Sequence, residues 1–449
     1  MTTSIVLFNR DLRVHDHPAL AAAVRQSERV VPLFVLDRRI TKAEHTSPNR
    51  SQLLVDALHD LRASLRSLGG DLIVRHGDLP AEVMRVARDT DASVLWSSED
   101  VSPFARRRES SLREACRVAG LELRLTPGIT IVPPDELQTS TETPYRVFTP
   151  YWRSWSAALR REVETSPQHV PLGDGMDPGE IPDPDVLSPG TRSLRLPHGG
   201  EAAARAQLSA LLSQPPADDD SIEGSSRLGM AIHFGCLSPL EVEVTLQAEP
   251  GHAKLLRSLC WRDFYHQFTA NQPNTTTSDF RPRGIPWRRD TELEQAWEEG
   301  MTGYPFVDAA MRQLRQEGWM HNRLRLVVAS ILTKHLGIDW RVGAAHFNRW
   351  LVDGDVANNT ANWQWVAGTG TDSRPNRILN PVRQARRFDP RGDYVHRYVS
   401  ELASLSVGQI HEPWLLDPTQ FSQLGYPERV LDHEAAAAAF REGVRSTKV

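Results

Sequence analysis

Cysteine is scarce in this chain, and its scarcity excludes two kinds of architecture. The 449 residues contain three cysteines, Cys116, Cys236 and Cys260, which stand far apart and are odd in number. A disulfide framework or a zinc module needs paired or clustered cysteines, so we expect neither. We predict three buried thiols instead.

Long apolar runs and export signals are lacking as well. No stretch approaches the roughly 20 apolar residues that a membrane-spanning helix needs. Residues 1–10 lack the basic start, apolar core and small-residue cleavage site of a signal peptide. We therefore expect a cytoplasmic, monomeric protein that does not bind a membrane.

An excess of positive charge is also missing, because the formal net charge is −5. Proteins that bind nucleic acid usually present a positive surface, so the overall charge gives no case for such binding. Arginines nevertheless crowd the C-terminal half, which leaves room for a local basic face. Taken singly, most of them are expected on solvated helix faces.

The first 125 residues alternate short apolar runs with helical patterns. This alternation is typical of a doubly wound α/β domain with a parallel sheet. Neither GxGxxG nor GxxxxGK[ST] is present, so an ordinary dinucleotide or P-loop site is excluded. The expected strands are 5–8, 30–36, 72–74, 94–96 and 121–125, and the expected helices are 18–27, 50–68, 80–88 and 103–119.

The remainder of the chain has a different pattern. Residues 126–200 are rich in Pro and Gly, which indicates a long connector with one short helix at 151–163. Long helical patterns such as 253–270 and 307–316 then replace the strand-like alternation, so we predict an all-α second domain. The predicted domains are 1–130 (α/β), 131–200 (connector) and 201–449 (all-α).

Tryptophans and polar residues gather in this helical part. Eight of the 12 tryptophans fall between Trp261 and Trp365. Any one of them would ordinarily serve a hydrophobic core. Asn, Asp and Arg residues are concentrated beside them, and burying so many polar groups is costly unless a polar ligand satisfies them. We expect an aromatic heterocyclic ligand.

Several of these motifs closely resemble the photolyase/cryptochrome family, with the nearest resemblance to bacterial class I cyclobutane pyrimidine dimer photolyases. They occur in the family's order along essentially the whole chain. The chain lacks the cysteine cluster of the family's iron–sulfur branch. The motifs are FNRDLR at 8–13, SSRL at 225–228, WRDFY at 261–265, TGYPFVDAAMR at 302–312, WMHNR at 319–323 and DGDVANN at 353–359.

The resemblance implies that FAD binds in the helical domain. Arg325 and Asp353 match an ion pair beside the isoalloxazine ring, and Asp355 matches a contact to the ring edge. Asn359 matches the residue that faces flavin N5, where an amide offers both a donor and an acceptor; the alternative for this residue is a helix cap. The residues that match the phosphate-binding loop are Ser225, Ser226, Arg227 and Leu228.

The resemblance also implies an electron relay. Trp363, Trp340 and Trp287 match the family's chain of three tryptophans, which carries an electron from the surface to the excited flavin. Indole is oxidisable, so a row of indoles can pass charge where aliphatic side chains cannot. Trp297 and Trp319 are interpreted as packing residues.

The predicted substrate is DNA that contains pyrimidine dimers. Trp261 and Trp365 match residues that hold the two rings of the flipped-out dimer, and Asn322 matches a third residue of that cavity. Arg323, and the arginines near Arg374 and Arg377, are candidates for phosphate contacts. The implied reaction is light-dependent repair by electron transfer from excited, reduced FAD.

A second, light-harvesting chromophore is expected in the α/β domain. Residues 98–103 look more like members of the family that bind 8-hydroxy-5-deazaflavin than like those that bind methenyltetrahydrofolate. The choice between the two stays open at this point.

The sequence departs from the class I pattern beside the substrate cavity. Ser258 stands three residues before Trp261, where the family has a glutamate that contacts the thymines, and Leu326 replaces a methionine. These changes keep a second function open, a cryptochrome-like blue-light photoreceptor without repair activity, and a weaker third one, a light-independent electron-transfer flavoprotein. The intact set of Trp261, Asn322 and Trp365 favours repair.

Overall fold

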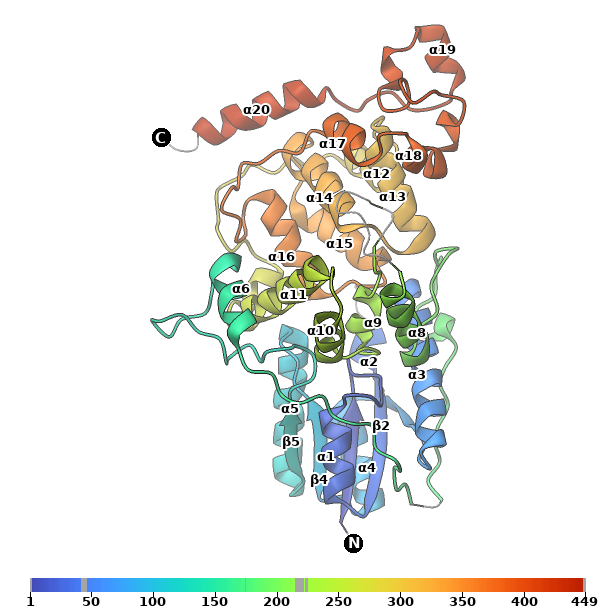
Figure 1. Ribbon diagram of the computed structural model, residues 1–449, viewed down its shortest axis with the longest axis vertical. Coiled ribbons are helices and arrows are strands. Elements are labelled where there is room, and N and C mark those ends of the chain that lie inside the picture. Colours follow the sequence, from blue (N-terminus) through green and yellow to red (C-terminus); the bar gives the residue numbers. More distant parts are fainter. Residues whose placement is uncertain (1, 42–46, 174, 215–221, 223–224, 447–449) are drawn as a thin grey trace. The chain divides into compact units, whose positions relative to one another are not determined.

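The structure is a computed structural model that describes residues 2–41, 47–173, 175–214, 222 and 225–446. The chain forms two compact units (Figure 1). The first unit comprises Met1–Arg192, Pro197–Pro216 and Ser226–Pro273, and the second comprises Ser193–Leu196, Ala217–Ser225 and Asn274–Val449. The domain limits expected from the sequence, at 130 and 200, stay a prediction.

A five-stranded parallel sheet forms the base of the first unit. Its strand order is β3-β2-β1-β4-β5. β1 and β2 are mostly apolar and almost wholly buried because helices cover both faces of a parallel sheet of this kind, whereas β5 at one edge is partly exposed. All five expected strands are confirmed, with ends that shift by up to three residues. They are β1 (Thr3–Phe8), β2 (Arg29–Asp37), β3 (Ile73–Gly77), β4 (Val94–Ser98) and β5 (Glu122–Thr126).

The four expected crossover helices are present as well. Each begins after a side chain that caps its first turn and has a proline at its first or second position, which is the usual signal for a helix start. Right-handed crossovers place the first two on one face of the sheet and the last two on the other. They are α1 (Pro18–Gln26), α3 (Pro48–Ser67), α4 (Leu79–Thr90) and α5 (Pro103–Ala119).

The period-2 alternation of the strands builds one core of this unit. Ile5 and Leu7 of β1 and Leu33 of β2 pack in one buried cluster with Val83 of α4 and Leu112 of α5. A short helix, α2 (Arg38–Thr41), follows β2. Cys116, Cys236 and Cys260 are buried free thiols, as expected.

Six further helices complete the first unit. The short helix predicted at 151–163 is wrong in its limits, because it begins three residues earlier and ends six residues earlier. It ends early because the Arg160 guanidinium donates hydrogen bonds to the carbonyls of Trp155 and Ala158, at 2.9 and 2.7 Å. The six are α6 (Phe148–Ala157), α7 (Pro184–Leu187), α8 (Glu201–Leu212), α9 (Gly229–Phe234), α10 (Pro239–Ala248) and α11 (Ala253–Asn271).

The second unit is helical, which confirms the predicted fold class of an α/β part followed by an all-α part. Among the described residues beyond β5 the structure has no strand, only an isolated bridge between Arg288 and Ile338. No described helix is long and apolar enough to cross a membrane. The helices are α12 (Thr291–Glu299), α13 (Pro305–Glu317), α14 (Asn322–Ser330), α15 (Trp340–Trp350), α16 (Val356–Ala367), α17 (Pro381–Phe388), α18 (Asp393–Tyr398), α19 (Pro418–Gln423) and α20 (His433–Ser446).

Candidate flavin and DNA site

A polar cavity in the second unit brings together five of the residues predicted to contact flavin or substrate. α14 supplies Asn322 and Arg325, the loop before α16 supplies Asp353 and Asp355, and α16 itself supplies Asn359. The same cavity is lined by Leu326, Asn358, Asn362 and Trp363. Residues from positions 322 to 363 therefore converge on one cavity through three neighbouring segments.

The guanidinium of Arg325 in this cavity is held by two neighbours. One guanidinium nitrogen of Arg325, Nη2, lies 3.1 and 2.8 Å from the two carboxylate oxygens of Asp353. Its Nε donates to the Met320 carbonyl at 2.8 Å. The ion pair expected from the sequence thus forms, and the Met320 carbonyl fixes the direction of the arginine side chain.

Asp355 caps helix α16. Its Oδ1 accepts hydrogen bonds from the backbone N–H and from the side-chain amide of Asn358, at 2.9 and 2.7 Å. A carboxylate at a helix N-terminus is favoured by the unpaired backbone N–H groups there. The alternative interpretation of Asn359 as a helix cap is therefore wrong, because Asp355 has that role.

Asn359 is buried, and its amide is oriented by two acceptors. Its Nδ2 donates to the Ala344 carbonyl and to Oδ1 of Asn348, both at 2.9 Å. A backbone carbonyl can only accept, so the NH₂ group must point toward it. The amide oxygen is consequently the group that Asn359 presents to the cavity, an acceptor alone rather than the donor and acceptor expected from the sequence.

A neutral histidine starts helix α14. Nδ1 of His321 accepts the backbone N–H of Arg323 at 3.2 Å, so this nitrogen must be unprotonated. Burial, together with the positive charges of Arg325 and Arg323, lowers the pKa of His321 to about 4. The α14 helix continues into a π-helical turn, Ile331–His335, a distortion that often occurs at functional sites.

The three relay tryptophans differ in burial. Trp363 and Trp340 are almost fully buried, whereas Trp287 is partly exposed. Trp363 meets Phe347 and Trp297 edge-on, with ring centroids 5.0 and 5.9 Å apart. Of the three, only Trp287, the last ring of the predicted path, is partly exposed.

Two of these rings are fixed by specific neighbours. Trp363 packs directly against Gly343 of α15, where a Cβ atom would overlap the indole ring. Nε1 of Trp340 donates to Asp279 at 2.9 Å, and the Arg341 guanidinium lies 4.6 Å from its ring centroid. Sequence reasoning did not find Gly343 or Asp279.

A buried lysine is a further residue that sequence reasoning missed. Lys334 is 2% exposed, and its ammonium donates to the carbonyls of Ala367 and Pro375 at 2.7 and 2.8 Å. Its nitrogen also lies 4.5 Å from the centroid of the Phe440 ring. Burial lowers the pKa of Lys334 to about 7. The residue links the end of α16, the loop before α17 and helix α20.

The second unit also holds the substrate candidates Trp365, Arg377 and Arg323. Trp365 is partly buried, and the Arg377 guanidinium lies 5.3 Å from its ring centroid. Arg323 lies 4.9 Å from the ring of Phe388. Each of these arginines therefore lies over an aromatic ring.

Trp261 and Ser258 belong to α11 in the first unit. The Trp261 ring lies flat against Phe148, with centroids 3.6 Å apart and planes 3° from parallel. Ser258 is exposed, and its hydroxyl donates to the Lys254 carbonyl of its own helix at 3.0 Å. This backbone contact occupies the hydroxyl that stands where the family pattern has a carboxylate.

The predicted phosphate-binding loop precedes α9. Arg227 has a positive φ of 51°, an uncommon conformation for a residue with a side chain. Ser226 accepts a hydrogen bond from Gln207 through its carbonyl at 2.6 Å, and Leu228 is buried. Ser225 counts with the second unit and the next three residues with the first.

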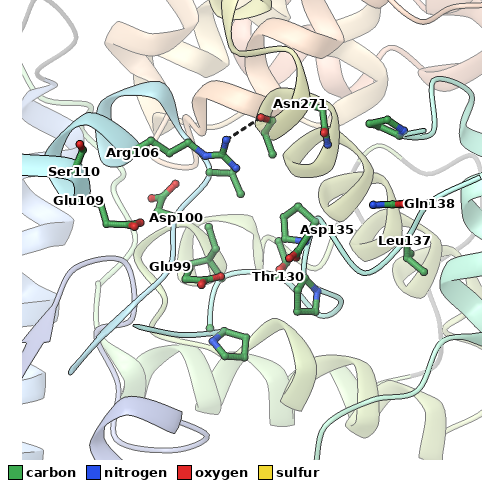
Figure 2. A pocket seen from close by; sticks show the side chains of 18 of the residues that line it. Glu99, Asp100, Arg106, Glu109, Ser110, Thr130, Asp135, Leu137, Gln138 and Asn271 are labelled. Carbon is green, nitrogen blue, oxygen red and sulfur yellow. Dashed lines mark hydrogen bonds between the residues drawn. The ribbon is translucent and has the colours of Figure 1, made fainter. Parts of the chain in front are cut away.

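A larger hollow lies in the first unit, beyond the carboxyl end of β4 (Figure 2). It measures about 530 Å³, within the range of ligand pockets. Glu99 and Asp135 contribute carboxylates, and Arg106 is tied to the Ala270 carbonyl at 3.0 Å. Burial, followed by the negative charges of Asp135 and Glu109, raises the pKa of Glu99. Its lining thus includes several carboxylates.

A pair of arginines stands at the neighbouring strand ends. Arg10, which follows β1, lies 3.4 Å from Asp100, which follows β4. Arg108 of α5 donates to the side-chain oxygen of Asn9 at 2.7 Å, and burial lowers the pKa of its guanidinium. β1 and β4 flank the point where the strand order reverses, which is where open α/β sheets bind ligands.

Comparison with known proteins identifies relatives of both parts. Residues 4–171 match the family model described as DNA photolyase, and residues 255–446 match the FAD binding domain of DNA photolyase. A deoxyribodipyrimidine photo-lyase of Streptomyces griseus is 46% identical over 98% of each chain. A cryptochrome DASH of Natronomonas pharaonis is 37% identical over 97% of this chain and 99% of its own. The crystal structure of a bacterial class III photolyase from Agrobacterium tumefaciens superposes with a TM-score of 0.89 at 30% identity, covering 100% of this chain and 98% of the other.

Proposed function

Because this chain belongs to the photolyase and cryptochrome family, we propose that it repairs cyclobutane pyrimidine dimers in DNA with light and FAD. The observation that carries the proposal is the cavity that joins the Arg325–Asp353 ion pair with Asn359, whose amide oxygen is left as an acceptor because its NH₂ group is engaged by Ala344 and Asn348.

The residues of the cavity fit a flavin. An isoalloxazine ring carries N–H groups, one of them at N5 in the reduced state, and Asn359 offers an acceptor for it. Arg325, held in place by Asp353, would direct its guanidinium hydrogen-bond donors toward an anionic ring bound in this cavity. Bound and reduced, FAD supplies the photoexcited electron that opens the cyclobutane ring and then takes the electron back. The protein's own residues supply binding, orientation and charge.

We assign the substrate contacts to aromatic and basic residues. Trp261 and Trp365 would each stack on one ring of the flipped-out dimer, which offsets the base stacking lost from the duplex. Asn322 lines the flavin cavity and would hydrogen-bond a pyrimidine edge. Arg323, Arg374 and Arg377 would contact phosphates, which position the DNA without reading its sequence.

We assign the electron relay to Trp363, Trp340 and Trp287. Two observations support this direction: Trp363 lines the cavity assigned to flavin, and Trp287 is partly exposed. The relay would return a flavin that has become oxidised to the reduced state that repair requires.

We place the second chromophore at the strand ends of the first unit. Arg10 and Arg108 suit 8-hydroxy-5-deazaflavin, whose acidic ring hydroxyl gives the molecule a negative charge; methenyltetrahydrofolate is the alternative. The hollow in Figure 2 is lined by four carboxylates and two arginines, and this excess of negative charge disfavours an anionic ligand there. Absorption spectra of chromophores extracted after expression with each compound distinguish the two.

A photoreceptor without repair activity is the second candidate. Two observations favour it: the similarity to a cryptochrome DASH, and Ser258, whose hydroxyl bonds its own helix instead of reaching toward a substrate. Both functions use the same flavin cavity and relay. Only the fate of the dimer separates them.

The decisive experiment is therefore a repair assay. Chemically reduced protein is mixed with an oligonucleotide that contains one thymine dimer, and restored thymines are measured in the light and in the dark. Repair predicts restoration in the light alone. No restoration, from protein that still carries FAD and photoreduces it, would support the photoreceptor.

A further inference from the structure

Trp261 has only part of its indole available for a ligand, because another aromatic ring covers one of its faces. Phe148, the first residue of α6, stacks on it at 3.6 Å with the planes 3° from parallel. Phe264 and Tyr265 contact the same indole at an angle. Trp261 remains partly exposed, so its accessible surface lies away from Phe148.

Phe148 is itself held in place on several sides. It is 6% exposed, and the edge of Phe264 meets it with centroids 5.9 Å apart and planes at 83°. The guanidinium of Arg257, which is exposed, lies 5.0 Å from its ring centroid. A cation over an aromatic face is attractive. The ring therefore cannot turn without losing contacts with α11.

The other end of α6 is fastened to the same helix. Nε1 of Trp155 donates to the fully buried carboxylate of Asp263 at 3.0 Å. The same carboxylate oxygen accepts the backbone N–H groups of Ile131 and Val132, at 2.9 and 3.1 Å. Phe148 and Trp155 of α6 therefore contact Trp261 and Asp263 of α11, so α6 is held against α11 at two points.

We propose that Phe148 is a positioning residue for substrate binding, which acts by holding the Trp261 indole in one plane with its accessible surface toward the dimer. The inference rests on the function proposed above. A tryptophan that stacks on a flipped base must have its ring plane fixed beforehand, since each rotamer it has to give up weakens binding. Phe148 removes that freedom without touching the substrate.

The test compares two substitutions at this position. Phe148→Leu keeps an apolar side chain but removes the ring, whereas Phe148→Tyr keeps the ring. Phe268→Leu makes the same change at a buried position of α11 that is seven residues from Trp261, and serves as the structural control. Binding to dimer-containing and to undamaged duplex is measured at one salt concentration, together with FAD content and Tm.

We expect Phe148→Leu to weaken binding of the dimer-containing duplex about three- to tenfold, the range for loss of one aromatic pair. Binding to undamaged duplex and FAD content should stay at the level of the Phe268→Leu control, and Phe148→Tyr should retain dimer binding. Unchanged dimer binding in Phe148→Leu, or an equal loss for damaged and undamaged duplex, overturns the proposal.

A second readout does not depend on repair. Near-ultraviolet circular dichroism of Phe148→Leu should differ from wild type, and this difference should vanish when both proteins carry Trp261→Leu, because the signal arises from the stacked pair. A difference that persists in the Trp261→Leu background overturns the positioning role. If the wild type fails to distinguish damaged from intact DNA while this cycle behaves as expected, the proposed function fails and the coupling of the two rings stands.

Discussion

Aromatic side chains are arranged differently in the two units of the molecule. In the first unit Phe148 lies flat on Trp261, and Trp152 and Trp155 stack with centroids 5.6 Å apart and planes 19° from parallel. In the second unit Trp363 meets its aromatic neighbours edge-on, and Trp340 is held by a hydrogen bond to a carboxylate.

The two arrangements suit different tasks. Face-to-face stacking makes a flat apolar surface that a further flat ring can join. Edge-on contacts and separate hydrogen bonds hold each ring at its own position without building a common surface. We propose that Trp261 of the first unit serves binding, together with Trp365 of the second, whereas the edge-on Trp363 and the hydrogen-bonded Trp340 serve electron transfer.

The largest effect is expected from Trp340→Phe, which removes one ring of the proposed relay. Light-driven reduction of oxidised flavin should be abolished, because phenylalanine is much harder to oxidise than tryptophan. Repair by chemically reduced protein should survive, since Asp279 keeps Arg341 as a partner at 2.9 Å and the local fold is retained. Flavin absorbance under illumination and thymine recovery measure the two activities.

The matched control is Trp350→Phe. Like Trp340, Trp350 has an arginine near its ring, with Arg315 5.6 Å from the centroid, but it is only partly buried and lies outside the proposed relay. It should leave photoreduction unchanged. A loss of both activities in Trp340→Phe would show that the substitution acts through folding.

Close packing of the relay predicts a large effect from a small change. In Gly343→Ala the new methyl group would overlap the Trp363 ring. Overpacking of this kind costs roughly 1–3 kcal/mol of unfolding free energy, although alanine is otherwise the better helix former. Denaturant unfolding measures it, with Gly408→Ala as control because no heavy atom lies within 4 Å of a Cβ there. Equal stability of the two variants would contradict the packing described for Trp363.

A substitution in the second unit, Trp365→Ala, tests whether a ring outside the stacked cluster of the first unit also binds the dimer. If Trp365 stacks on the dimer, its loss should weaken dimer-specific binding by about 1–3 kcal/mol and leave binding to undamaged DNA almost unchanged. Trp365→Phe, which keeps a ring, should lose less. Titrations at one fixed salt concentration remove the phosphate contribution from the comparison. Unaltered discrimination in Trp365→Ala would mean that this ring does not hold the dimer.

The smallest expected effect concerns acidity in the second unit. The pKa of His321 in the folded protein, about 4, lies below the ordinary histidine value of 6.5. Between these values the unfolded chain binds more protons than the folded one, so stability rises with pH across this window and is lost as the pH falls from 6.5 toward 4. His321→Asn retains a side-chain acceptor for the helix start and should flatten this part of the Tm–pH curve. An unchanged slope would mean that other groups cause the loss of stability at acid pH.

Much of the fold was predictable because its signals are local. Runs such as 30–36 are apolar throughout, and α5 has a capping serine, a proline and a terminal glycine at the expected places. The limits of α6 were not predictable, because they depend on Arg160, a residue outside the helix.

The candidate site likewise has features that the sequence predicts and features that it does not. The Arg325–Asp353 pair forms as expected, since the motif resemblance names both partners. The orientation of the Asn359 amide depends on Asn348 of the preceding helix, and an asparagine in a helix gives no sign that it is buried. Phe148 stands 113 positions before its partner Trp261, and only the spacing of aromatics along 148–155 hints that the helix has an aromatic face.

The contacts of Lys334 imply that shortening the protein at its C-terminus would disturb the second unit. Its ammonium rests under the Phe440 ring of the last helix while it holds the carbonyls of Ala367 and Pro375. Deleting α20 would expose this buried cation to water, which would then compete for both carbonyls. A protein trimmed before residue 433 would therefore be altered at the end of α16, two residues from Trp365, although the deleted segment contains none of the proposed site residues. A purification tag is therefore better fused to the N-terminus, so that the contacts of α20 are not disturbed.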